Sequence, residues 1–253
     1  MIVDVQFSPA STDWPRLRSA AIAAEARGFG AIHVFDHLAG VPLGGSTMLE
    51  CFTVLGCLAV VRESIELGTM GANVWNRQVG TLVTGAATVT AVSRRRFLFG
   101  IGAGASPGSD WALEQRLVGA ELEPDLALRH ARVEAVLDLA ESLWSTDRDE
   151  MFATFPLPVP KPTIIVGVNS VGLSRLAGRR ADGINVQWNH ARRDEFLAAA
   201  DAEAADRRFL RTAYISYDEA LLDPSHPTRV DMAARRIDRL VLAVFDDLGA
   251  WSD

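Results

Sequence analysis

This chain has few cysteines, no long apolar stretches and no excess of positive charge. Only two of its 253 residues are cysteines, and 25 Lys plus Arg stand against 32 Asp plus Glu, for a formal net charge of −7. So few cysteines exclude a disulfide scaffold, and 23% charged beside 49% apolar residues excludes intrinsic disorder. An acidic chain is a poor partner for nucleic acid or an anionic membrane, and we expect neither.

The apolar runs, the opening residues and the cysteines also predict the compartment in which the protein resides. No apolar run reaches the roughly 18 to 20 residues that cross a bilayer. The opening residues 1–4 also lack the basic start of a secretory signal peptide. Cys51 and Cys57 lie in one apolar run on roughly opposite faces of a predicted helix, so we expect two buried thiols without a disulfide. These features predict a cytoplasmic protein.

Short apolar runs alternate with longer helical segments through the whole chain. Eight such steps in about 250 residues are typical of a TIM (β/α)8 barrel, and a doubly wound open sheet is the alternative. We expect residues 1–253 to form a single domain, with a last helix that is truncated or missing because the chain stops soon after the eighth strand. The predicted strands span residues 2–7, 31–36, 65–70, 97–103, 163–168, 183–188, 212–217 and 239–244, and the predicted helices span 14–27, 49–62, 79–92, 125–144, 171–180, 192–207 and 230–236.

In a barrel, chemistry gathers at the carboxyl ends of the strands. Asp36 and His37 follow the second strand, and a histidine there can exchange protons near neutral pH, although it can equally serve as a hydrogen-bonded loop residue. Small residues after the fourth strand let a ligand approach the backbone, or else form a tight turn. Asn169 and Ser170 open the helix after the fifth strand, where they favour either an anion site or an N-cap.

Several well-known motifs are missing. The chain has no G-x-S-x-G elbow, no G-x-x-x-x-G-K phosphate loop and no C-x-x-C pair, and its five histidines lack the spacing of metal ligands. We therefore predict no metal site. Of the six tryptophans, Trp75, Trp111 and Trp188 suggest an apolar pocket, although each is also compatible with core packing.

Four segments, in order, resemble one family. They are GFGAIHVFDHL (28–38), ESIELGTMGANVWNRQVGTLVTGAATV (63–89), SRRRFLFGIGAGAS (93–106) and KPTIIVGVNSVGLSRLAGRRADGINVQW (161–188). Together they resemble the luciferase-like flavin and deazaflavin oxidoreductases, and within these the coenzyme F420-dependent branch. The resemblance implies a TIM barrel that binds its cofactor at the carboxyl face and acts on a small-molecule substrate, commonly as a homodimer with the helices after strands two and three at the contact.

The resemblance also assigns residues. It implies that Asp36 and His37 lie beside the reactive ring carbon, with His37 transferring a proton while the cofactor carries hydride. A non-proline cis peptide at Met70–Gly71 would support the ring, and Asn73 and Arg77 would lie near the ring and tail. The implied phosphate contacts are Gly102, Ala103, Gly104, Asn169, Ser170, Val171 and Gly172.

Departures from the family pattern leave three functions open. Ala105 replaces the glutamate of the sugar-phosphate dehydrogenases, which argues against that reaction, and Gly102 and Ala103 replace the luciferases' cysteine and arginine. Arg94 and Arg95 replace two glycines. We expect an F420-dependent oxidoreductase acting on a small organic substrate. The alternatives are an FMN-dependent monooxygenase, and a non-catalytic flavin-binding relative, which the shortened carboxyl end suggests.

Overall fold

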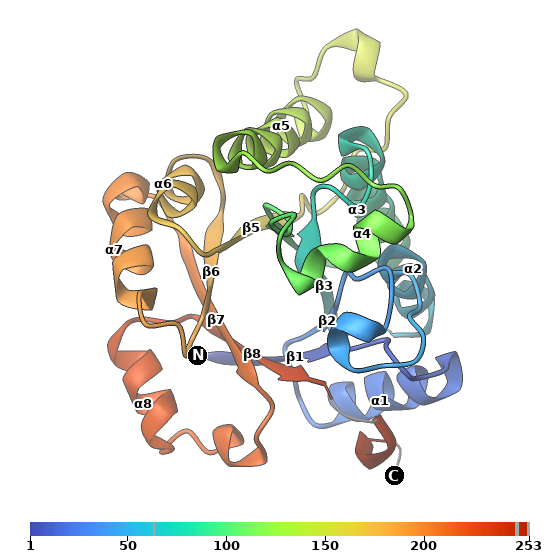
Figure 1. Ribbon diagram of the computed structural model, residues 1–253, viewed down its shortest axis with the longest axis vertical. Coiled ribbons are helices and arrows are strands. Elements are labelled where there is room, and N and C mark those ends of the chain that lie inside the picture. The colour runs from blue at the N-terminus through green and yellow to red at the C-terminus, as the bar shows by residue number, and fades with distance from the viewer. Residues whose placement is uncertain (63, 246–247, 252–253) are drawn as a thin grey trace.

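Eight parallel strands close into a barrel in the order β1 to β8. The computed structural model describes residues 1–62, 64–245 and 248–251. The first strand pairs with the last, with Val5 opposite Leu242, so the sheet has no free edge. Figure 1 shows the strands enclosed by helices, which confirms the predicted TIM barrel. The strands are β1 (Ile2–Phe7), β2 (Ala31–Val34), β3 (Glu66–Asn73), β4 (Phe97–Gly102), β5 (Thr163–Val168), β6 (Gly183–Gln187), β7 (Leu210–Ser216) and β8 (Arg239–Val244).

Helices cover the outside of the barrel, and capping residues fix where several of them begin. Asp13 accepts a hydrogen bond from the Arg16 amide at 2.9 Å and stands just before a proline in the first turn. Short 3-10 turns η1 (Val41–Leu43), η2 (Asp110–Ala112), η3 (Glu150–Phe152) and η4 (Glu219–Leu222) lie in the connections. The helices are α1 (Trp14–Ala26), α2 (Cys51–Val61), α3 (Val79–Ser93), α4 (Leu113–Leu117), α5 (Leu126–Trp144), α6 (Val171–Arg180), α7 (Arg193–Ala204) and α8 (Pro227–Ala234).

Five strands end at another residue than predicted, and for β2 and β3 the difference exceeds one residue. β2 stops at Val34, because the residues after it turn away from the sheet to contact neighbouring loops. β3 continues to Asn73 through a register shift between Thr69 and Ala72. The peptide bond between Met70 and Gly71 is cis, as the family resemblance implied.

Ion pairs close the amino-terminal end of the barrel. Arg239 donates to both carboxylate oxygens of Asp4, at 2.7 and 2.8 Å, and pairs with Glu66 at 2.9 Å. Burial alone would raise the pKa of Asp4, but hydrogen bonds from His33 and Arg239 outweigh it and lower the pKa. Because these charged groups fill the floor of the barrel, the opposite end is left for ligand binding.

A four-residue turn, η5 (Leu248–Trp251), takes the place of a helix after β8. Trp251 packs against Phe7, with 5.1 Å between ring centroids, and against Phe29 at 5.6 Å. The Arg27 guanidinium lies over the same indole at 4.6 Å. Among the described residues, η5 is the element that follows β8, and Trp251 covers apolar residues on the outside of the barrel.

The two cysteines lie on opposite faces of α2 and form no disulfide, as predicted. Cys51 is buried, and its thiol contacts the Val34 carbonyl at 3.6 Å. Cys57 is exposed, so the prediction of two buried thiols is wrong for this residue. The apolar run around it faces solvent on one side because only one face of α2 packs on the barrel. In the described part of the chain, no helix combines the length and apolar character needed to cross a membrane.

Candidate functional site

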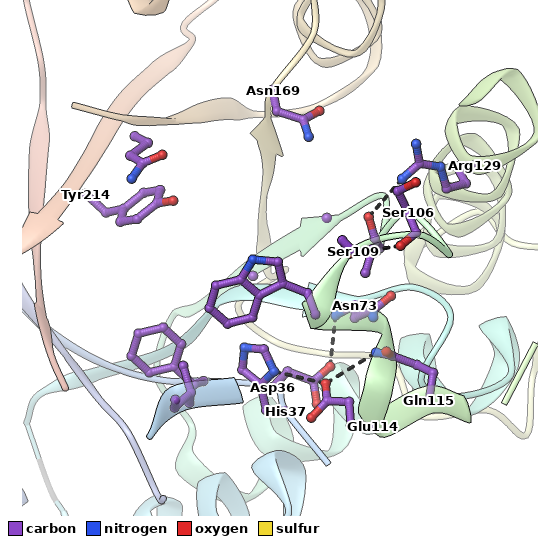
Figure 2. Close-up of a pocket in the computed structure, with 18 of the residues that line it drawn as sticks. Asp36, His37, Asn73, Ser106, Ser109, Glu114, Gln115, Arg129, Asn169 and Tyr214 are labelled. Carbon is purple, nitrogen blue, oxygen red and sulfur yellow. Dashed lines mark hydrogen bonds and ion pairs between the residues drawn. The ribbon is translucent and has the colours of Figure 1, made fainter. Parts of the chain in front are cut away.

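A cleft with two overlapping lobes opens at the carboxyl end of the barrel. The larger lobe has a volume of about 580 Å³ and the smaller about 300 Å³. Figure 2 shows His37 and Glu114 on one side of this cleft, with Asn169 and Tyr214 on other sides. The lobes share the lining residues Phe35, Asp36, His37, Gly71, Gly102, Gly104, Arg129, Asn169 and Tyr214.

Four glycines, Gly71, Gly102, Gly104 and Gly167, line part of the smaller lobe. A Cβ atom built on Gly102 would meet nothing within 4 Å, so a side chain there would project into the open cleft. Gly104 has φ +77°, and its Cβ would lie 2.7 Å from the Trp75 ring and 2.8 Å from Asn73. The Met70 carbonyl is held by Gln6 at 2.8 Å. This wall therefore offers a flat ligand close access to the main chain.

Asp36 is buried and fully occupied as an acceptor. Arg77 donates to both of its carboxylate oxygens at 2.7 Å, and the backbone amide of Asn73 donates at 2.9 Å. Burial alone would lower the pKa of Arg77, but its hydrogen bonds and charge attraction to Asp36 raise it. Arg77 also pairs with Glu50 at 2.6 Å. The Asp36–Arg77 pair thus holds the end of β3 in place, with Arg77 outside the lining of the cleft.

His37 is oriented by a buried glutamate. Its Nδ1 lies 2.9 Å from Oε1 of Glu114, whose Oε2 accepts from the backbone amides of Leu38 at 2.8 Å and Ala39 at 3.0 Å. Burial alone would raise the pKa of Glu114, but hydrogen bonds from His37 and these amides lower it. An ionised Glu114 requires Nδ1 to donate, so in the neutral imidazole Nε2 is the nitrogen that can accept a proton. Among the described residues Nε2 has no hydrogen-bond partner.

The sequence patterns did not indicate Glu114 or Arg129. Arg129 lies in the second turn of α5, lines both lobes and donates to the Gly104 carbonyl at 3.2 Å. It is the one arginine or lysine among the described lining residues. Both residues reach the cleft from the connection after β4 and the helix that follows it. A lone charge in such a polar segment is usually solvated, so no local signal marks either.

The turn before α6 contributes less than the resemblance implied. Asn169 lines both lobes, whereas Ser170, Val171 and Gly172 do not. The Ser170 hydroxyl caps α6 by accepting from the Leu173 amide at 3.3 Å, and it also contacts His130 at 3.3 Å. Of the two roles that the sequence allowed for Ser170, the structure therefore shows the N-cap. Met70, Gly71, Asn73, Gly102, Ala103 and Gly104 all line one or both lobes.

One of the three singled-out tryptophans, Trp111, lines the cleft. Trp75 lies beneath the Arg132 guanidinium, 4.5 Å from its centre, and Trp188 is buried against Arg193. Within the described residues, no three His, Cys, Asp or Glu side chains gather into a group that could hold a metal ion. The cleft thus combines a glycine-rich wall, one cation, and a histidine held by a carboxylate.

Known proteins resemble this chain in sequence and fold. A model of the luciferase-like monooxygenase family matches residues 3–220. An F420-dependent glucose-6-phosphate dehydrogenase of Nakamurella multipartita is 27% identical over 188 residues, covering 70% of this chain and 52% of that protein. The chain thus spans about half the length of that relative. The namesake from Beutenbergia cavernae is 26% identical over 262 residues, covering 96% of this chain and 73% of that protein.

Solved structures show the same fold at low identity. An F420-dependent secondary alcohol dehydrogenase in complex with an F420–acetone adduct matches with a TM-score of 0.75 and 14% identity, covering 100% of this chain and 97% of that one. The coenzyme F420-dependent tetrahydromethanopterin reductase of Methanopyrus kandleri matches with a TM-score of 0.67 and 14% identity, covering 99% and 96%.

Proposed function

This chain belongs to the luciferase-like monooxygenase family, and we propose that it is an F420-dependent oxidoreductase that transfers a hydride between the deazaflavin and a small organic substrate. The main support for this proposal is the position of His37, which lines both lobes and is oriented by Glu114. The relatives described as F420-dependent dehydrogenases support the choice of cofactor.

The smaller lobe fits a flat ring with a phosphate-bearing tail. Gly71 and Gly102 both line this lobe, and a Cβ added to Gly102 would meet nothing within 4 Å, so no side chain there separates the ring from the backbone. Arg129 and Asn169 line the same lobe and supply a cation and an amide for a phosphate group. When bound there, the cofactor supplies the site that accepts or donates hydride.

His37 would handle the proton that accompanies the hydride. In the oxidation direction, the substrate's C–H bond breaks and its electron pair leaves with the hydride to the cofactor. The O–H proton passes to Nε2 of His37, and a carbonyl product remains. The reverse reaction returns this proton from His37. A positioned acid or base contributes about 10²- to 10⁴-fold to rate. We assign Asp36 a positioning role, because its carboxylate is already held by Arg77 and Asn73.

Fluorescence titration with F420 and, separately, FMN tests the cofactor. We expect F420 to bind at micromolar concentration or tighter and FMN more weakly. Arg129→Ala should weaken F420 binding by at least tenfold, because it removes the cation of the lobe. Arg192→Ala loses an exposed ion pair with Glu195 and a contact with the Phe196 ring, both on α7 and outside the cleft lining, and should leave F420 binding unchanged. Preference for FMN, or binding of neither, would overturn the F420 proposal.

The catalytic assignment has its own test. His37→Ala should slow turnover by about 10²-fold or more with little change in F420 affinity. An unchanged rate would remove His37 from proton transfer, and an equal loss of affinity would make it a cofactor contact.

We also propose that the chain forms a homodimer through α2 and α3. These helices lie side by side (Figure 1), and neither contains a charged residue within its bounds. Val60 and Val92 are exposed, and a groove of about 380 Å³ lined by Phe52 runs between the helices. Apart from Glu50 at the groove, this surface is uncharged and partly apolar, which suits a second copy of the same chain. Val60→Asp should shift the mass measured by light scattering from dimer to monomer, and a wild-type monomer would refute this.

A further inference from the structure

A row of rings lines the larger lobe beside His37. The His37 ring lies 5.5 Å from Trp111 and 6.4 Å from Phe35, and Phe35 lies 5.2 Å from Phe245. Leu43 of η1 adds a further apolar contact to this lobe. These residues come from η1, η2 and the segments after β2 and β8, so the row forms only in the folded barrel.

Two of these rings are exposed although they face a cavity. Trp111 is 49% and Phe245 43% exposed, and both line the larger lobe but not the smaller. Large apolar side chains left open to solvent inside a concave site gain stability when a ligand covers them. The larger lobe therefore favours a ligand with an apolar, flat body next to His37.

The charges of the cleft disfavour an anionic ligand in this lobe. Among the described lining residues, the charged groups besides His37 are Asp36, Glu114 and Arg129. Asp36 and Glu114 are carboxylates with partners of their own, and Arg129 also belongs to the smaller lobe. A substrate phosphate would have no cation of its own here and would lie near two carboxylates.

Neutral polar side chains in the larger lobe can hold an oxygen of the substrate. Tyr214 projects its hydroxyl toward the cleft, across from His37 (Figure 2), and burial raises the pKa of this phenol, so it stays a protonated donor. Gln187 lines the same lobe from β6. The side chains of these two residues have no hydrogen-bond partner among the described residues. They can hold a hydroxyl or carbonyl oxygen of the substrate, and the same lobe is also lined by Asn73, Ser106, Ser109, Gln115 and Asn169.

From these observations we infer that the substrate is an uncharged alcohol or carbonyl compound with an aromatic or flat apolar body, which stacks on Trp111, rather than a sugar phosphate. This inference rests on the proposed function and assigns the larger lobe to the substrate. The alcohol loses one hydride to the cofactor and one proton to Nε2 of His37, and the matching aryl ketone or aldehyde is the product.

Binding can be measured without turnover. Saturation-transfer NMR with 1-phenylethanol or with glucose 6-phosphate reports contact with the protein whether or not F420 is present. We expect 1-phenylethanol to bind and glucose 6-phosphate not to compete. Trp111→Ala should weaken the binding of 1-phenylethanol at least tenfold, and Trp111→Phe should restore most of it. Phe155→Ala is the matched control, because Phe155 is 41% exposed and contacts Phe152 of η3, away from the cleft.

The same protein is then assayed for turnover by the absorbance of F420. Oxidation of 1-phenylethanol in preference to glucose 6-phosphate supports the inference. Preference for the sugar phosphate, failure of 1-phenylethanol to bind, or binding that Trp111→Ala leaves unchanged overturns it. If F420 does not bind while 1-phenylethanol still binds at Trp111, the proposed function fails and the assignment of the larger lobe stands. If F420 binds and the sugar phosphate is oxidised, the proposed function stands and the inference of an uncharged aromatic substrate fails.

Discussion

Replacing Glu114 by glutamine should reverse the tautomer of His37. The backbone amides of Leu38 and Ala39 both donate to Oε2 of Glu114, at 2.8 and 3.0 Å. In Glu114→Gln these two donors keep the amide oxygen on their side, so the NH₂ group faces Nδ1 of His37. Nδ1 must then accept, and the ring proton moves to Nε2. His37 can no longer take a proton from the substrate at that nitrogen.

The size of the effect follows from the groups that change. Losing a base through the wrong tautomer costs about 10²- to 10⁴-fold in kcat. Replacing a charge-assisted hydrogen bond by a neutral one also lowers the free energy of unfolding by about 1–2 kcal/mol. F420 affinity should change little, because Glu114 lines only the larger lobe.

Nitrogen NMR of the histidine rings measures the tautomer directly. We expect His37 to carry its proton on Nδ1 in the wild type and on Nε2 in Glu114→Gln. Glu195→Gln, a change at an exposed ion pair on α7, is the control and should alter neither the ring signals nor kcat. If Glu114→Gln keeps the wild-type tautomer and a kcat within about threefold of it, Glu114 does not orient the base.

Three further substitutions test the scaffold. Gly104→Ala puts a methyl group against the Trp75 ring at φ +77° and should cost about 1–3 kcal/mol in urea unfolding; an unchanged midpoint would contradict this contact. Arg94 has a left-handed backbone at φ 55°, which glycine adopts without strain. Arg94→Gly should therefore raise the free energy of unfolding by about 1 kcal/mol, seen as a higher Tm. Asp4→Asn breaks the buried pair with Arg239 and should cost about 3–5 kcal/mol at pH 7. Because folding lowers the Asp4 pKa below its ordinary 3.8, this stability exists above that pH and is lost as pH falls through the folded pKa, so wild type and variant should converge in acid.

The barrel strands could be predicted because burial leaves a clear pattern. The expected bounds of β1, β5 and β8 match the structure residue for residue, since strands covered on both faces form uninterrupted apolar runs. The prediction for β3 ended at Met70, because Gly71 to Asn73 no longer read as an apolar run. α8 begins at Pro227, three residues before the predicted start, with His226 as its cap. Proline in a first turn resembles a loop when only apolar periodicity is considered.

The site was predictable where it is built from backbone, and less so where it depends on distant side chains. The glycines after β4 and the Met70–Gly71 bond lie within contiguous motifs, so the resemblance could place them. Glu114 meets His37 across 77 residues, and Arg129 meets Gly104 across 25. Both contacts depend on how the connection containing α4 folds back over the barrel mouth, which local periodicity does not encode.

The lining of the cleft and the outer cover of the barrel are built from different segments. The described lining extends from Phe35, just after β2, through Phe245, just after β8. On the outside of the barrel, Trp251 of η5 packs against Phe7 and Phe29. A buried tryptophan removes about 150–250 Å² from water, which corresponds to at most about 4–6 kcal/mol. The ring and cation contacts of Trp251 involve Phe7, Phe29, Tyr217 and Arg27, and none of these residues lines the cleft. In the described part of the chain, the packing of η5 on the barrel and the lining of the cleft therefore depend on different residues.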